Sequence, residues 1–598
     1  MRRTSLLATA LLVALPAAAE TEPRHWRNAP TPPMGWNSWD CFGTTLTEAQ
    51  AKAQADAMAQ YLKPYGWNVF TVDIQWYEPE SKGHAYKDGA KLEMDKYSRL
   101  VPAVKKFPSA TNEAGFKPLA DYVHSKGLKF GIHIMRGIPK QAVAQNTPIR
   151  GTRARAQDIA KQDSTCGWNP DMFGVDMAKE GAQDYYDSLF KLYASWGVDF
   201  VKVDDISRPY DNVQRAEVEA IRKAIDKSGR PIVLSLSPGD TPLDYGEHVM
   251  KHANLWRISD DFWDRWQPLH EMFGRLEKWT PHRAPGAWPD ADMLPFGTIE
   301  FKRPTNFTQD EQVLCLSLWC IARSPLIFGG DMTKLDPFTL RLLTNPEVLA
   351  VNQKSTGNRQ LSRDNDLIVW AAEVPGTRDR YVGLFNAQDR TMPYDLTKAL
   401  YRSPILRKSD EVANISVSVA GAKQLVLVVT DAGDNIHLDH ADWIEPTLRG
   451  PKGELKLSGV KWRSAQQGYG ETRANTMTNG QPISVAGKPV EGIGTHAFSV
   501  IEFDVPEGYD TFQGRGVLSP SRPGEGGSIE FVVLTDAANR NIPDRNTVSV
   551  TLAELGIPGK AKARDLWKRQ DLGVVEGKFS QAIPLHGAGL YRLSPAGN

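Results

Sequence analysis

The feature that most constrains the fold is a regular alternation of short apolar runs with longer amphipathic stretches between about residues 33 and 330. Runs rich in β-branched and aromatic residues predict strands. Stretches with a 3.6-residue period predict helices, and residues 182–196, in which Tyr185, Leu189 and Leu192 share one face, are an example. This alternation is typical of βα units around a parallel sheet. The eight predicted strands are residues 34–39, 69–76, 128–135, 200–205, 232–237, 255–261, 285–294 and 325–330.

Eight βα units predict a (β/α)8 TIM barrel, whose chemistry lies at the carboxyl ends of the strands. Six polar or aromatic residues stand at or near those ends, and any one of them alone would fit a helix cap or a turn. Their recurrence at corresponding places predicts one shared pocket. They are Trp39, Asp73, His133, Asp204, Asp261 and Asp292.

The N-terminus has the pattern of a secretory signal peptide over residues 1–19: a basic start, an apolar run and a small-residue cleavage site before Glu20. No later run approaches the roughly 18 apolar residues of a membrane helix, so we expect a soluble periplasmic or secreted protein. The 598 residues are too many for one core and predict two or three domains.

The charge is balanced, with 71 basic and 71 acidic residues, which argues against nucleic acid or an anionic membrane as partner. A neutral substrate is the better prediction. The four cysteines are even in number and export permits disulfides, but their spacing fits no zinc pattern. No metal and no cofactor is predicted. The cysteines are Cys41, Cys166, Cys315 and Cys320.

Paired carboxylates at strand ends indicate glycoside hydrolysis, which with about 5 to 5.5 Å between the carboxyl groups retains the anomeric configuration through a covalent intermediate. Asp204 follows Lys202 by two residues, so both side chains point to one face and the ammonium favours an ionised nucleophile. Asp205 points to the other face, and we predict that it is a loop residue or a residue that supports the site rather than the group that attacks. Asp260 and Asp261 both remain candidates for the general acid/base.

Six ordered motifs resemble glycoside hydrolase family 27, the clan of α-galactosidases and α-N-acetylgalactosaminidases: "TPPMGWNSWDCFG", "FTVDIQW", "LKFGIHI", "WGVDFVKVDD", "WRISDDFW" and "PGAWPDADML". The resemblance covers about residues 25–390 and resumes near residue 543. It implies a catalytic barrel, here residues 25–350, an antiparallel C-terminal β-sandwich domain, and retaining exo-hydrolysis by two aspartates.

The resemblance also implies residue roles. The K-x-D motif makes Asp204 the nucleophile, and the aspartate four residues after Arg257 is Asp261, with Asp260 as the alternative because the segment between the arginine and its D-D-x-W is short here. The substrate-binding residues implied directly are Trp39, which stacks under the sugar, Asp73, which holds sugar hydroxyls, and the basic pair Lys202 and Arg257.

This sequence departs from the family pattern at positions that determine which sugar is bound. Ile74 stands where galactosidases carry a second carboxylate that reads the galactose O4 or O6 hydroxyl. His133 replaces a tyrosine, and Ser237 replaces a glutamate, as in the N-acetylgalactosaminidase branch. We expect His133 to hydrogen-bond the sugar rather than bind metal. Arg136 and Trp168 are further pocket candidates, with a surface salt bridge and a loop anchor as the alternatives.

The C-terminal region predicts a β-rich module inserted into another. Residues 355–392 and 543–598 resemble two halves of the family's β domain, and residues 395–537 resemble the NPCBM family of carbohydrate-binding modules. Insertion into a surface loop is compatible with folding of the host domain. The acidic stretch "DAGDNIHLDHAD" lacks the EF-hand pattern, so a solvated loop is favoured over a calcium site.

Together these features predict a secreted retaining exo-glycosidase acting on oligo- or polysaccharides. α-Galactosidase is the favoured specificity, and β-L-arabinopyranosidase, α-N-acetylgalactosaminidase and isomalto-dextranase are the alternatives, which Ile74 fits better than galactose. A non-catalytic glycan-binding protein is the rival from another class. The presence of both strand-end aspartates with Lys202 and Arg257 argues for the enzyme.

Overall fold

The computed structural model describes residues 22–388, 394–433, 436, 438–485, 487–519, 527–538 and 546–596. The predicted signal peptide lies outside these residues, as does part of the acidic stretch near residue 434. Within them, none of the helices combines the length and the apolar character that crossing a membrane requires. The chain divides into two compact units, residues 1–389 with 546–598, and residues 390–545.

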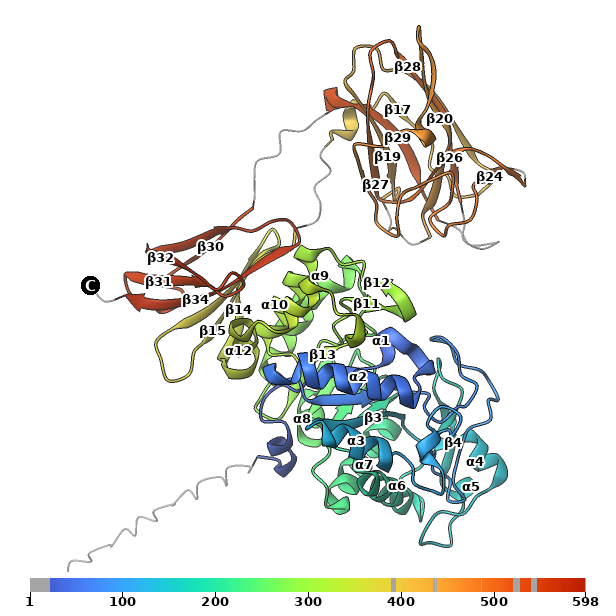
Figure 1. Ribbon diagram of the computed structural model, residues 1–598, viewed down its shortest axis with the longest axis vertical. Helices are drawn as coiled ribbons and strands as arrows, with labels where there is room; N and C mark the ends of the chain where they lie inside the picture. The colour runs from blue at the N-terminus through green and yellow to red at the C-terminus, as the bar shows by residue number, and fades with distance from the viewer. Residues whose placement is uncertain are drawn as a thin grey trace, which may run out of the picture. The chain divides into compact units, whose positions relative to one another are not determined.

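The first unit contains the predicted barrel (Figure 1). Its eight strands pair in chain order, all in parallel, and a parallel bridge between Leu294 and Phe328 joins the last two around the ring. The prediction of a (β/α)8 barrel is confirmed, and every strand except β3 ends earlier than predicted. The eight strands are β1 (Met34–Asn37), β2 (Val69–Val72), β3 (Lys129–Met135), β7 (Phe200–Asp204), β8 (Val233–Leu236), β9 (Leu255–Arg257), β10 (Trp288–Asp290) and β13 (Leu326–Phe328).

Helices follow the barrel strands and bury their apolar faces against the sheet. Three of them begin with a capping box, at Thr47, Asp211 and Thr308, which satisfies backbone N–H groups of the first turn. Gly197 and Gly229 end α6 and α7 in the left-handed conformation, which glycine adopts without steric cost. The outer helices are α2 (Glu48–Tyr61), α3 (Lys117–Ser125), α6 (Ala182–Trp196), α7 (Asn212–Ser228), α8 (Gly246–His252), α9 (Trp266–Trp279), α10 (Gln309–Ala322), α11 (Pro337–Leu343) and α12 (Pro346–Lys354).

Loops at the carboxyl ends of the strands carry additional small elements. A three-stranded antiparallel sheet lies between β3 and α6, and a two-stranded hairpin lies between β10 and α10. These insertions surround the end of the barrel at which the predicted site residues stand. The elements are α1 (Trp39–Phe42), β4 (Ile138–Pro139), α4 (Lys140–Gln145), α5 (Ala156–Ile159), β5 (Ala160–Thr165), β6 (Met172–Val175), β11 (Thr298–Ile299) and β12 (Arg303–Pro304).

The C-terminal part of the first unit is an antiparallel β-sandwich. Its larger sheet has the strand order β14-β15-β16-β34-β31-β32, and β30 pairs with β33 in the second layer. Val369, Val382, Val550 and Phe579 are among the buried residues between the layers. The strands are β14 (Thr356–Asp364), β15 (Leu367–Glu373), β16 (Arg380–Asn386), β30 (Thr547–Thr551), β31 (Lys560–Asp565), β32 (Gln570–Glu576), β33 (Lys578–Ala582) and β34 (Gly587–Ala596).

The second unit is also an all-β sandwich, with a core around Trp443, Phe512 and Phe531. One sheet has the order β17-β29-β19-β27-β22, and the other the order β18-β28-β20-β26-β23 with β21 beside β20. Its strands are β17 (Tyr401–Arg402), β18 (Val412–Ser418), β19 (Gln424–Thr430), β20 (His440–Gly450), β21 (Gly453–Lys456), β22 (Ser464–Gln466), β23 (Arg473–Ala474), β24 (Ser484–Val485), β25 (Lys488–Pro489), β26 (Gly492–His496), β27 (Ser499–Asp504), β28 (Thr511–Leu518) and β29 (Glu530–Thr535).

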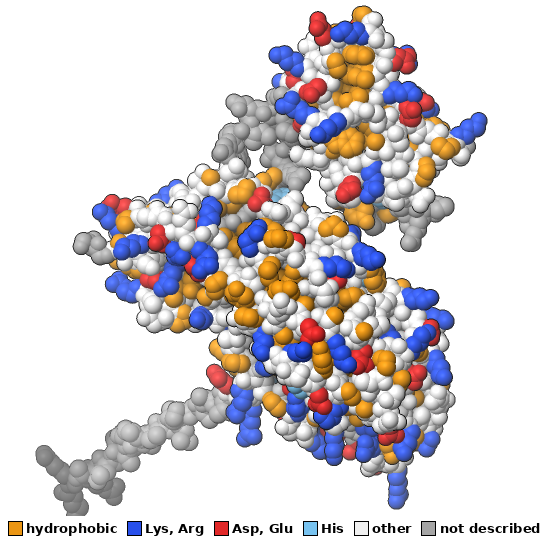
Figure 2. All heavy atoms as spheres, in the orientation of Figure 1, with side chains coloured by type: hydrophobic (Ala, Val, Ile, Leu, Met, Phe, Trp, Pro, Cys, Tyr) orange, Lys and Arg blue, Asp and Glu red, His pale blue; other side chains and the backbone are white. Residues whose placement is uncertain are grey.

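The surface reflects the balanced charge of the sequence. Basic and acidic side chains are interspersed on the face drawn in Figure 2. All four cysteines are described, and each is a free thiol; three of them are buried.

Candidate active site

Neighbouring strands bring the predicted polar residues together at one end of the barrel. In the register of β3 against β7, His133 lies opposite Lys202 and Met135 opposite Asp204. Asp73 follows β2, the neighbour of β3 on its other side. Because parallel strands end at the same edge, side chains distant in sequence meet here.

Asp73 is the most extensively bonded carboxylate of the site. Its Oδ1 atom lies 2.7 Å from His133 Nδ1 and accepts the Ile74 backbone N–H at 2.9 Å, while Oδ2 accepts from Asn37 Nδ2 at 2.8 Å. Lys202 Nζ lies 3.6 Å from Oδ2. Burial acts to raise the pKa of Asp73, but the His133 and Lys202 charges and these hydrogen bonds hold it well below its usual range. Asp73 is therefore an anion that organises its neighbours.

Asp204, the last residue of β7, is buried at the strand end. Its Oδ2 atom lies 3.4 Å from His133 Nε2, and Oδ1 accepts the Asp205 backbone N–H at 2.6 Å. Burial raises the pKa of Asp204 above its ordinary value, and the charges of His133 and Lys202 oppose that rise. Burial acts to lower the pKa of Lys202, but the Asp73 and Asp292 carboxylates raise it, so the ammonium stays charged.

Arg257, the last residue of β9, contacts the carboxylates of Asp261 and Asp292. It is fully buried, its Nη2 atom lies 2.9 Å from Asp292 Oδ2, and the same atom lies 3.4 Å from Asp261 Oδ1. The Asp261 side chain is 57% exposed and the Asp260 side chain 62% exposed. Asp260 pairs instead with Arg208 at 2.5 Å. The two adjacent carboxylates therefore have different partners, and Asp261 is the one directed to the strand-end arginine.

Asp205 turns away from Asp204, as its position in the strand predicts. Its carboxylate pairs with Arg136 Nη2 at 2.9 Å, and its backbone carbonyl accepts from Arg136 Nε at 2.6 Å. Arg136 Nη1 also bonds Glu217 of α7 at 3.0 Å. Burial raises the pKa of Asp205 to about 7 although Arg136 lowers it. Arg136 thus forms buried ion pairs behind β7, and the groups that it contacts belong to Asp205, Glu217 and Ser164.

The remaining predicted residues differ in exposure. Ile74 is fully buried beside Asp73, and Ser237 is buried after β8, where its backbone N–H bonds the Val203 carbonyl at 2.8 Å. Trp168 is 38% exposed, and the Arg208 guanidinium lies 5.8 Å from its ring centroid. Through Arg208, Trp168 belongs to the same outer cluster as Asp260.

Aromatic residues surround the site on the side of β1. The Trp39 ring is half-buried, stacks at 16° with Tyr86 at 6.1 Å, and meets His84 edge-on at 5.1 Å. Burial and the Asp204, Asp73 and Asp261 carboxylates raise the pKa of Tyr86, which indicates that its hydroxyl lies in their common field. His84 also contacts Phe301 on the turn between β11 and β12.

Several of these residues were not selected from the sequence. Asn37 and Asp40 belong to the "MGWNSWDCFG" motif. The feature that could have identified them in the sequence is a polar residue near the end of the first strand. Asp40 is buried, and burial and the Asp292 charge raise its pKa well above the ordinary value. Tyr86 and His84 lie in a long loop without periodicity, which offered no signal.

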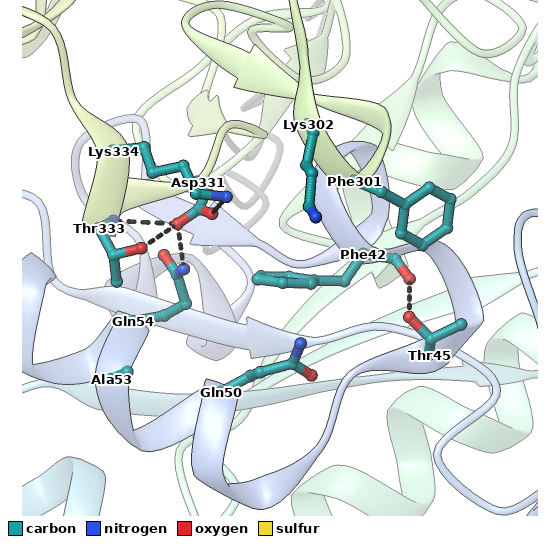
Figure 3. A pocket seen from close by; sticks show the side chains of 10 residues that line it. All are labelled: Phe42, Thr45, Gln50, Ala53, Gln54, Phe301, Lys302, Asp331, Thr333 and Lys334. Atoms are coloured by element: carbon teal, nitrogen blue, oxygen red, sulfur yellow. Dashed lines mark hydrogen bonds and ion pairs between the residues drawn. The ribbon is translucent and has the colours of Figure 1, made fainter.

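A separate cavity of about 330 Å³ lies beside α1 and α2 (Figure 3). Phe42, Phe301 and Asp331 are among its lining residues, and no predicted site residue is. Asp331 is held by Gln54 at 2.5 Å and by Thr333 at 2.6 Å, and both bonds are drawn in Figure 3. This cavity is therefore distinct from the cluster around Asp204.

Comparison with known protein families assigns each part of the chain. Residues 140–354 match the family described as alpha galactosidase A. Residues 394–449 and 453–551 match the NPCBM/NEW2 domain, and residues 521–593 match the alpha galactosidase C-terminal beta sandwich domain. The barrel with carboxylates at its strand ends and the carbohydrate-binding module define a glycoside hydrolase that acts on a carbohydrate.

Comparison with individual relatives identifies the family of glycoside hydrolases. The chain is 32% identical over 405 residues to alpha-galactosidase A of Cellvibrio japonicus, covering 65% of this chain and 83% of that protein. It is 30% identical to alpha-galactosidase 2 of Arabidopsis thaliana, covering 58% of this chain and 74% of that protein. A solved structure of a β-L-arabinopyranosidase from Geobacillus stearothermophilus, in complex with arabinose, is 39% identical, has a TM-score of 0.68, and covers 96% of this chain and all of that one. The chain belongs to glycoside hydrolase family 27.

Proposed function

We propose that this enzyme is a secreted, retaining exo-β-L-arabinopyranosidase that releases terminal arabinopyranose from oligo- or polysaccharides. The observation that carries the sugar assignment is Ile74, which is fully buried beside Asp73. The full-length likeness to the Geobacillus arabinopyranosidase supports it.

An apolar residue at position 74 favours a sugar that lacks the hydroxymethyl group. β-L-Arabinopyranose shares the ring stereochemistry of galactose but lacks its hydroxymethyl group. A pocket that pairs a substrate hydroxyl rejects analogues without it, because its own polar group is then left unpaired. The resemblance to family 27 implies a second carboxylate at position 74 for galactose, and an apolar side chain there leaves no such group to satisfy. Asp73 remains to hold the ring hydroxyls that both sugars share.

In the proposed double displacement, two aspartates carry out the two steps together. Asp204 attacks the anomeric carbon while Asp261 protonates the leaving oxygen, which gives a glycosyl–aspartate; Asp261 then deprotonates the water that releases the sugar. Asp204 has the position of a nucleophile because it is buried next to His133 and Lys202. Asp261 is solvent-accessible, as a group that exchanges protons with water must be.

The choice of Asp261 over Asp260 rests on their surroundings. The charge of Asp261 acts on the pKa values of Asp204 and Lys202. Asp260 is instead directed to Arg208 at 2.5 Å, whereas Asp261 faces Arg257, which also holds Asp292. Trp39 supplies the apolar face for the sugar ring, and His133, Ser237 and Arg257 complete the proposed substrate-binding set.

α-Galactosidase, the specificity favoured from sequence, is the second candidate. The names of the Cellvibrio and Arabidopsis relatives support it, each at about 30% identity. The experiment that separates the two measures initial rates of the mature chain on p-nitrophenyl β-L-arabinopyranoside, α-galactoside and α-N-acetylgalactosaminide. We expect the arabinopyranoside to have the highest kcat/KM and Asp204→Ala to abolish it. A higher kcat/KM on the galactoside would instead support the second candidate.

The second unit is proposed to hold polysaccharide near the barrel and so raise the local substrate concentration. Its insertion point allows a clean excision, because Asn386 at the end of β16 donates to Asn546 Oδ1 at 3.3 Å, just before β30. The chain on either side of residues 390–545 is therefore already close together.

Excision tests this role. Joining residue 388 to residue 546 through two glycines should leave kcat/KM on the aryl glycoside unchanged and lower the rate on insoluble polysaccharide. Equal rates of the two forms on polymer would contradict the role.

Secretion is tested on the exported protein, whose N-terminal sequence should begin at Glu20.

A further inference from the structure

Two histidines and a glutamate meet on the outer helices of the barrel, where α7 packs against α8. His248 and His252 are four residues apart on α8, so they lie on one face of the helix. Glu219 reaches them from α7. One ligand atom from each of the three lies within 4.8 Å of the other two. No residue of the strand-end site takes part.

The distances are close to those of a metal site before an ion draws the ligands together. His248 Nε2 lies 3.1 Å from Glu219 Oε1, and the two imidazole rings have centroids 4.4 Å apart. In tetrahedral zinc sites the metal–ligand bonds of about 2.0 to 2.2 Å put ligand atoms roughly 3.3 Å from one another. The three ligand atoms lie within 4.8 Å of one another, so they have to approach by about 1.5 Å or less to reach that spacing.

The hydrogen bonds of the two rings orient them as ligands. His252 Nδ1 lies 2.9 Å from the His248 backbone carbonyl, which can only accept, so Nδ1 donates and Nε2 carries the lone pair. His248 Nδ1 lies 2.8 Å from the Tyr210 hydroxyl, which can accept in the same way. Metal-binding histidines generally donate their second ring nitrogen to such an oxygen, because this fixes the tautomer and the ring orientation.

Access and charge also suit an ion. The Glu219 side chain is 57% exposed and the His248 side chain 21% exposed, so an ion can enter from solvent and keep water as a fourth ligand. We propose that Glu219, His248 and His252 bind one divalent transition-metal ion, with zinc the best match to two imidazoles and a carboxylate. The ion would join α7 to α8 and, through Tyr210, the loop that connects Asp204 to α7.

The test uses the untagged mature chain, treated with a chelator and titrated with Zn²⁺ by calorimetry. We expect one zinc per chain and a Tm that rises with zinc concentration, since an ion that binds only the folded state stabilises it. His252→Gln and Glu219→Gln each remove a ligand and should weaken zinc binding by about tenfold or more. Tyr210→Phe keeps all three ligands and should weaken binding less.

The matched control is His270→Gln, which breaks a different surface pair, His270 with Asp366 at 3.1 Å. This variant should bind zinc as the wild type does. Tm values without zinc check that each variant is folded. The proposal is wrong if the wild-type chain binds no stoichiometric zinc, as expected of a cluster held only by hydrogen bonds, or if His252→Gln and His270→Gln bind it equally well.

Discussion

The His133 imidazole bridges two carboxylates of the candidate active site, with Nδ1 2.7 Å from Asp73 and Nε2 3.4 Å from Asp204. Its Nε2 atom is buried and has no hydrogen-bond partner within the described part of the chain. Because Asp73 fixes the ring from one side, Nε2 faces Asp204. His133 thereby connects the residue proposed to hold the sugar with the residue proposed to attack it.

His133→Gln should move the acid limb of the pH profile. The His133 charge opposes the burial that raises the pKa of Asp204, so its removal raises that pKa further. A nucleophile must be ionised, and the acid limb of kcat/KM should therefore shift to higher pH. The substitution also removes the 2.7 Å bond between His133 Nδ1 and Asp73. Loss of a hydrogen bond to a charged group costs about 1.5 to 3 kcal/mol, which predicts roughly a ten- to hundredfold lower kcat/KM. His270→Gln is the control, and an unshifted acid limb would contradict the bridge.

Asp261→Ala and Asp260→Ala should differ in their dependence on the leaving group. Removal of the acid should slow substrates with poor leaving groups by about 10² to 10⁴-fold and activated aryl glycosides far less, with azide restoring the rate. We expect this of Asp261→Ala. Asp260→Ala breaks only an exposed pair with Arg208 and should have little effect. If Asp260→Ala alone shows the azide effect, the two roles are reversed.

Ile74→Asp should change the preference between the two sugars. The new carboxylate offers a partner for a galactose hydroxyl, and we expect the ratio of kcat/KM for α-galactoside to that for β-L-arabinopyranoside to rise by about tenfold or more. Part of the change will be lost arabinopyranosidase activity, because position 74 is fully buried beside Asp73. Ile74→Val, which adds no polar group, is the control and should leave the ratio within about twofold.

The sequence was sufficient to predict the barrel because strands buried on both faces form apolar runs between helical periods. The predicted strand 69–76 overshoots β2, which ends at Val72. Ile74 and Trp76 are as apolar as the strand itself, yet the chain has left the sheet by Asp73. Ile74 is buried beside Asp73, and Trp76 packs against Phe116 and Trp196. Composition does not distinguish these two ways of burying a side chain.

The site was predictable where a residue stands at a strand end and not where it comes from a loop or a second helix. Asp204 and Arg257 end their strands and were identified, whereas Tyr86 lies in an irregular segment. The histidines at 248 and 252 are four residues apart, but Glu219 precedes them by a full βα unit. Only the packing of α7 on α8 joins the three.

Arg136→Met should destabilise the barrel and slow catalysis together. The substitution leaves Asp205 and Glu217 buried without their shared cation, and breaking a buried ion pair in this way costs about 3 to 5 kcal/mol. The pKa of Asp205, already raised to about 7, should rise further. Ser164→Ala removes a single bond to the same guanidinium and should cost only about 1 kcal/mol. Urea denaturation measures the free energy of unfolding of both variants. Equal losses in Arg136→Met and Ser164→Ala would contradict a central role for the ion pairs of Arg136.

His25→Gln should make the stability of the protein less sensitive to acid. Burial, helped by the Arg222 charge, lowers the pKa of His25 to about 4 in the folded state, against about 6.5 when unfolded. Between these values the unfolded chain binds more protons, so stability falls as the pH falls, by about 2 kcal/mol from pH 7 to pH 5. Burial raises the pKa of Asp290 to about 6, which changes stability in the opposite sense, so the readout is the difference between variant and wild type. Urea denaturation at the two pH values measures it. An equal pH dependence in the two proteins would show that His25 titrates normally in the fold.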